Sequence, residues 1–153
     1  MPIAEIRIDE ALWSSASELR RQEWRTLIAD LLDEGPIAPA STARRLIVRM
    51  AAKTIVLELV GDDEIAFAEE VLAQHFDEYL SIIRKMVEDD ISAQRLEALD
   101  MAKKVVHDRA GRSIQQHAAR FADGLEPFRR LFSLLVALRV DTTSLPPAHR
   151  HRL

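Results

Sequence analysis

RRLIVRMAAKTIVLELV, residues 44–60, has an apolar residue at every second position on either side of a central Ala52-Lys53 pair. A turn at this pair gives an antiparallel hairpin in which one face is wholly apolar. That face carries Leu46, Val48, Met50, Ile55, Leu57 and Leu59. The other face brings Arg49 and Glu58 close enough to interact. The stretch therefore predicts a β-hairpin with one buried face, and the rest of the fold has to cover that face.

The spacing of apolar residues on either side of the hairpin predicts the remaining elements. EIRI, residues 5–8, alternates charged and β-branched residues, which is typical of a short strand. Apolar residues at helical spacing predict a series of helices. We expect them from Ser15 or Ser17 to Glu34, from Ile65 to Val87, from Ser92 to a break near 108–111, from Ser113 to about Phe121, and from Glu126 through Leu138.

These elements predict an α+β fold in one domain. We expect a small antiparallel sheet, formed by the N-terminal strand and the hairpin 44–60, packed against a bundle of four to five helices. The stretch 131–138 is apolar on every side except at Ser133, so the last helix should be enclosed by the others. Residues 1–141 form the expected domain, and residues 142–153 lack periodicity and predict a disordered basic tail.

Composition excludes several classes of protein. The chain of 153 residues has no cysteine, which rules out thiolate metal sites and thiol catalysis. Its four glycines are scattered, so neither a P-loop nor a dinucleotide-binding loop is present. No apolar run approaches the ~20 residues of a membrane span, and the N-terminus lacks a signal-peptide pattern. We expect a cytoplasmic protein without metal or cofactor, and the missing nucleophile motifs favour a non-enzymatic role.

Charge is distributed unevenly along the chain. Residues 1–102 hold 11 Lys and Arg against 21 Asp and Glu, whereas residues 103–153 hold 10 against 4. Either the basic third packs beside acidic N-terminal elements, or it forms a basic patch for an anionic ligand or partner. Aromatic residues do not interleave with these charges, which argues against nucleic-acid binding.

One cluster of polar residues stands out on the predicted helix that begins at Ser92. Asp100, Lys103, Lys104 and His107 fall within one sector of about 100° on a helical wheel, so they can point into one volume. They either form a solvated face in which Asp100 pairs with a lysine, or bind an anion or act as an acid–base group. The opposite arc should face the core. It consists of Ala98, Leu99, Met101, Ala102, Val105 and Val106.

A second basic pair, Arg129 and Arg130, opens the last predicted helix. Cations at a helix N-terminus oppose the helix dipole, so these arginines need a carboxylate or a bound anion beside them. If the pair joins Lys103, Lys104 and His107 in one site, the two helices that carry these residues must pack together.

Three stretches together resemble a known family. LEALDMAKK, residues 96–104, followed by His107 is similar to the pattern I-E-A-I-D-M-x-R-R-x-x-H, and RRLFSL, residues 129–134, is similar to R-R-L-F-T-L. DLLDE, residues 30–34, with Pro39 beyond it is similar to D-L-L-E-E-N-x-F-x-P. All three are typical of the bacterial uncharacterised protein family two-six-two of the UPF series. DRAGRS, residues 108–113, replaces that family's N-E-G-S, so the chain resembles a divergent member.

The resemblance implies no activity, but it places six residues on motif positions: Asp100, Lys103, Lys104, His107, Arg129 and Arg130. We expect a non-enzymatic interaction or regulatory protein that self-associates, because the edges of so small a sheet must be paired or covered. The alternative is a small-molecule enzyme or anion-binding protein that uses the cluster around His107. A third class is a nucleic-acid-binding protein. A concave pocket at His107 would favour the alternative.

Overall fold

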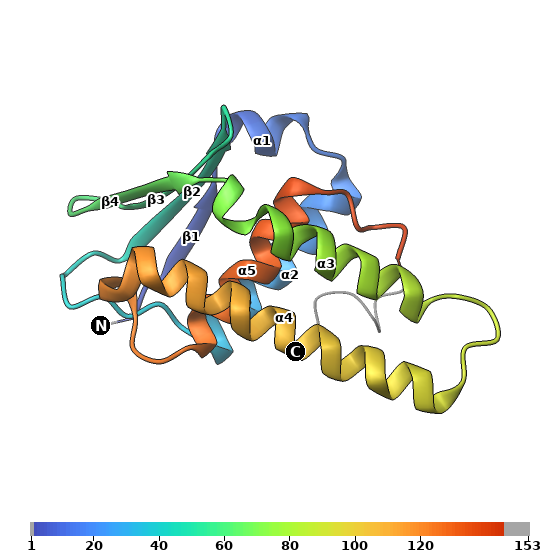
Figure 1. The fold of residues 1–153 in the computed structure, drawn as a ribbon. Coiled ribbons are helices and arrows are strands. Elements are labelled where there is room, and N and C mark those ends of the chain that lie inside the picture. The colour runs from blue at the N-terminus through green and yellow to red at the C-terminus, as the bar shows by residue number, and fades with distance from the viewer. Residues whose placement is uncertain (1, 146–153) are drawn as a thin grey trace.

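The computed structural model describes residues 2–145 and has the expected α+β fold (Figure 1). The strands are β1 (Glu5–Ile8), β2 (Arg45–Ala51), β3 (Thr54–Leu59) and β4 (Glu64–Ala68). The helices are α1 (Glu10–Ser15), α2 (Glu18–Glu34), α3 (Glu70–Met86), α4 (Ala93–Ala118), a 3₁₀ turn (Ala119–Phe121) and α5 (Glu126–Arg139).

The hairpin of β2 and β3 has the expected register. Met50 lies opposite Ile55, Val48 opposite Leu57 and Leu46 opposite Leu59, and five of these six side chains are buried. On the other face a nitrogen of Arg49 lies 2.6 Å from an oxygen of Glu58. This hydrogen bond is the main cause that raises the pKa of the Arg49 guanidinium, and burial opposes it with a smaller effect. The alternation of the sequence was therefore sufficient to define both faces of the hairpin.

The sheet differs from the prediction in two respects. It contains a fourth strand, and its first strand runs parallel to its neighbour. β4 pairs antiparallel with β3, although residues 65–68 were expected to begin the long helix. Ile65 and Phe67 are buried while Ala66 and Ala68 are exposed, which is the period of a strand. β1 runs parallel to β2 because α1 and α2 intervene between them, and the sheet order is β1-β2-β3-β4.

The helix α5 lies at the centre of the helical layer, as its apolar sequence predicts. It packs against α2 on one side and α4 on the other, and α4 in turn packs against α3 (Figure 1). Every residue from Leu131 to Leu138 is buried.

Beyond this helix, the hydroxyl of Thr142 donates to Glu23 at 2.7 Å. Of the expected tail, residues 146–153 lie outside the described residues.

The helix α4 is continuous, so the predicted break near 108–111 is wrong. Ser92 caps its start as expected, accepting from the Arg95 amide. Gly111 stands where α4 crosses α5: a Cβ at this position would lie 3.2 Å from the Arg129 amide nitrogen and 3.3 Å from Cδ1 of Leu125. The glycine permits close approach of two helices and does not end one.

Candidate functional site

The buried face of α4 is rotated with respect to the prediction. Lys103 and His107, assigned to the polar arc of the helix, are fully buried. Met101 and Val105, expected in the core, are 63% and 47% exposed. The buried face of α4 is built from residues at helical spacing: Lys103, Val106, His107, Ala110, Gly111, Ile114 and Ala118. Its small residues let α4 approach α5, and this brings Lys103 and His107, in the middle of the helix, into the interior.

The imidazole of His107 joins three helices. Its Nδ1 lies 3.1 Å from the carbonyl oxygen of Lys103, and because a carbonyl only accepts, Nδ1 carries the proton and donates. Nε2 lies 3.0 Å from the Ser133 hydroxyl on α5, from which it accepts a hydrogen bond when the ring is neutral. The ring also packs edge-to-face with Tyr79 of α3, at 5.0 Å between centroids, and with Phe132 of α5, at 5.7 Å. Both ring nitrogens are therefore satisfied within the core.

A serine hydroxyl hydrogen-bonded to a histidine is also the arrangement that activates a nucleophile. Here Ser133 and His107 are both buried. The three hollows described below are lined by other residues, so none of them brings a substrate to this pair. The geometry supports a structural role in which the pair fixes α4 against α5.

The other expected site residues are held by carboxylates. Asp100 lies 3.8 Å from the amine of Lys103 and 3.4 Å from that of Lys104, so the expected pairing is confirmed. Lys104 is exposed, whereas Lys103 is buried, so the two lysines do not share a solvent-facing surface. The exposure expected for Lys103 and His107 is wrong, because α3 and α5 cover them.

Arg129 and Arg130 have the carboxylate partners that their position at a helix start requires. Arg129 pairs with Asp108 of α4 at 3.0 Å, and Arg130 pairs with Glu34 of α2 at 3.0 Å. Both also contact Glu126 in the first turn of α5. α4 and α5 pack together, as a shared site on the two helices requires. Carboxylates from α2, α4 and α5, however, lie beside the two arginines in the place that a bound anion would take.

Further ion pairs connect the basic third of the chain to acidic residues before it. They are Arg109–Glu78, Arg120–Asp63 and Arg139–Glu69, in addition to Arg130–Glu34. The prediction that the basic third packs beside acidic N-terminal elements is thus confirmed.

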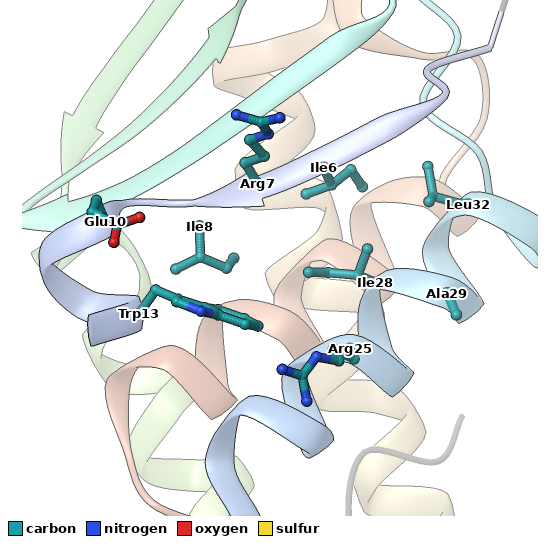
Figure 2. Close-up of a pocket in the computed structure, with 9 residues that line it drawn as sticks. All are labelled: Ile6, Arg7, Ile8, Glu10, Trp13, Arg25, Ile28, Ala29 and Leu32. Atoms are coloured by element: carbon teal, nitrogen blue, oxygen red, sulfur yellow. The ribbon is translucent and has the colours of Figure 1, made fainter. Parts of the chain in front are cut away.

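A hollow of about 440 Å³ opens between β1, α1 and α2 and is here called the β1 groove (Figure 2). Its lining residues are Ile6, Arg7, Ile8, Glu10, Trp13, Arg25, Ile28, Ala29 and Leu32. Two other hollows, of about 650 and 260 Å³, adjoin one another and share Lys53, Glu69 and Arg139, so charged groups dominate where they meet. The floor of the β1 groove is apolar, with Ile6, Ile8 and Ile28 among its residues.

Side chains in the β1 groove divide into an apolar floor and a charged rim. Figure 2 shows Ile6 and Ile8 extending from β1 toward Ile28, whereas Arg7 extends to the other side of the sheet. Trp13 of α1 closes one end, and the guanidinium of Arg25 lies 5.1 Å from the centre of its ring. The groove was not predicted because α1 was not expected, and without it nothing in the sequence placed Trp13 beside β1 and α2.

The arginines of this rim are held by exposed glutamates. Arg25 lies 2.9 Å from Glu18, and this hydrogen bond keeps the pKa of the Glu18 carboxyl below its usual value. Hydrogen bonds first from Arg7 and then from Arg45 lower the pKa of Glu5 in the same way. The carboxyls of Glu5 and Glu18 therefore stay ionised to lower pH than a free glutamate does.

Comparisons with known proteins identify a family only. The model of UPF0262, an uncharacterised protein family, matches residues 1–141. Neither a curated protein nor a solved structure matches the chain. Within residues 2–145 no three His, Asp or Glu side chains come together as metal ligands. In the same part of the chain no helix is both long and apolar enough to cross a membrane.

Proposed function

Since the chain belongs to the uncharacterised protein family UPF0262, we propose a function from its geometry: a non-enzymatic interaction or regulatory protein of the bacterial cytoplasm that self-associates. The observation that carries this proposal is the rotated orientation of α4, which exposes the apolar side chains of Met101 and Val105 in successive turns. The alternative, an enzyme or anion site at His107, has less support because that residue is enclosed.

The exposed apolar residues of α4 form a narrow surface. Ala98, Met101 and Val105, here called the α4 stripe, lie on the side of the helix opposite Lys103 and His107. In Figure 1 the first turns of α4 extend along the end of α3, away from the sheet. Removing such side chains from water is favourable by about 25 cal/mol per Å² of apolar surface. A partner that covers the stripe therefore gains free energy without any rearrangement of the fold.

Charge around the α4 stripe favours a second copy of the same chain as that partner. Glu97 precedes Met101 at the edge of the stripe, and Arg109 and Arg112 follow Val105, all exposed. Two α4 helices that cross antiparallel about a two-fold axis place Met101 opposite Val105 of the second copy. The same symmetry brings Glu97 near Arg109 of the second copy, so opposite charges meet at both ends. Three apolar side chains form a small interface, so we expect a weak dimer.

Sedimentation equilibrium of a variant tests this proposal. We expect the wild type to dimerise in the high micromolar range, and Met101→Glu combined with Val105→Glu to be monomeric, because like charges would meet across the axis. Both positions are exposed, so the melting temperature should hardly change. Leu19→Glu is the matched control, since Leu19 is 66% exposed on α2, outside the stripe.

Two results would contradict the α4 interface. The wild type could remain monomeric across the whole concentration range, which would remove self-association. Alternatively, the double glutamate variant could dimerise as the wild type does, which would place the contact elsewhere.

A further inference from the structure

We propose that the β1 groove binds an extended peptide segment of a partner protein, which pairs with the open edge of β1 and inserts apolar side chains beneath it. This site is separate from the α4 stripe and does not depend on the proposed dimer.

The backbone of β1 offers hydrogen-bonding groups on its outer side. The amides of Glu5 and Asp9 donate to carbonyls of residues 44 and 48, at 3.2 and 2.9 Å. Because successive residues of a strand direct their amide and carbonyl groups to opposite sides, those of Ile6 and Ile8 face away from β2. β1 is an edge strand, and among residues 2–145 no other strand pairs with that side. An added strand would supply the missing ladder.

The groove beside this edge suits the side chains that such a strand would carry. An added strand directs alternate side chains toward α2, into a hollow of about 440 Å³ whose floor includes Ile28, Leu32 and Trp13. That volume is typical of a ligand pocket. The partner segment therefore needs apolar residues at every second position.

The rim adds a preference for acidic residues between the apolar ones. Two guanidinium groups, of Arg7 and Arg25, line the groove. The glutamates that hold these arginines are each shared by two of them, Glu5 by Arg7 and Arg45 and Glu18 by Arg21 and Arg25, so the guanidinium charge is only partly neutralised. Glu10 is the carboxylate that lines the groove itself. Arg7 lies on the outer face of the sheet, where the intervening residues of an added strand would also point (Figure 2). A carboxylate next to Arg7 is favoured and an ammonium group is disfavoured.

A second copy of β1 does not meet these requirements. The apolar residues of β1, Ile6 and Ile8, are buried in its own core, at 6% and 8% exposure. They cannot also fill the groove of another molecule. A separate extended segment is the occupant that fits, which gives the protein a second, heterologous interaction surface.

Binding of a synthetic peptide tests this site directly. The probe is fluorescein-labelled GSVEVEVSG, which alternates valine and glutamate, and the matched control is GSVKVKVSG. Fluorescence anisotropy should show saturable binding of the acidic peptide and at least about tenfold weaker binding of the lysine peptide. The same titration with ¹⁵N-labelled protein should shift amide signals of β1 and α2. Unchanged signals at these elements, or equal binding of both peptides, would overturn the proposal.

A variant that fills the groove supplies the second test. Ala29 is exposed and lines the groove, so Ala29→Trp should weaken binding of GSVEVEVSG at least about tenfold without disturbing the core. Leu19→Trp places the same residue on the same helix outside the groove, and should leave binding unchanged. Equal binding by wild type and Ala29→Trp would refute the site. Met101→Glu with Val105→Glu should bind the peptide as the wild type does, so that failure of one interface is distinguishable from failure of the other.

Discussion

Leu135→Asp should leave the protein unable to fold. Leu135 is fully buried in the middle of α5, the helix that α2 and α4 enclose. An ionised carboxylate without a partner at such a position costs several kcal/mol, comparable to the ~5–15 kcal/mol by which a domain is stable. Circular dichroism should show loss of helical signal and of a cooperative thermal transition. Leu19→Asp introduces the same charge at an exposed position of α2 and should melt as the wild type does.

A folded Leu135→Asp protein with an unchanged melting temperature would contradict the placement of α5 at the centre. The contrast with Leu19→Asp guards against a general effect of added negative charge. Because the two variants have the same net charge, only the difference in burial separates them.

His107→Ala should destabilise the protein by about 3 kcal/mol or more. The change leaves a cavity between Tyr79 and Phe132 and removes the acceptor for the buried Ser133 hydroxyl. His117→Ala is the matched control: His117 is exposed and stacks on Phe67 at 5.0 Å, so its removal should cost about 1 kcal/mol or less. Urea unfolding followed by tryptophan fluorescence measures both changes.

A second substitution separates the hydrogen bond from the cavity. Ser133→Ala in the His107→Ala background removes the unsatisfied hydroxyl, so the double variant should lose less stability than the two single changes added together. Full additivity would mean that the two side chains do not interact. Wild-type stability of His107→Ala would show that the residue faces solvent, as the helical wheel suggested.

Local patterns predicted those elements whose residues fit a single periodicity or a uniformly apolar composition. The register of β2 and β3 followed from alternation alone, and the burial of α5 followed from its uniformly apolar stretch. β4 was missed because Ile65 and Ala68 also fit the helical spacing that continues to Leu72. The stretch forms a strand because it pairs with the otherwise open edge of β3, a contact that the helical spacing does not reveal.

The candidate site was harder to predict because burial of polar groups depends on partners from other helices. Apolar character placed Met101 and Val105 in the core, whereas the small residues Ala110 and Gly111 determined which face of α4 approaches α5. His107 could enter the interior because Ser133 and a backbone carbonyl satisfied its ring. Spacing predicted that Asp100 pairs with a lysine, but it gave neither the burial of Lys103 and His107 nor the carboxylates that Arg129 and Arg130 contact.

Thiol labelling of two adjacent positions tests the orientation of α4 most directly. The chain has no cysteine, so Val105→Cys and Val106→Cys each introduce a single thiol in place of the same residue. Val105 is 47% exposed and Val106 is 3% exposed, although the helical wheel assigned both to one face. In dilute native protein, Val105→Cys should react rapidly with a maleimide, whereas Val106→Cys should be protected until the protein unfolds. Equal rates, or faster reaction of Val106→Cys, would contradict this orientation of α4.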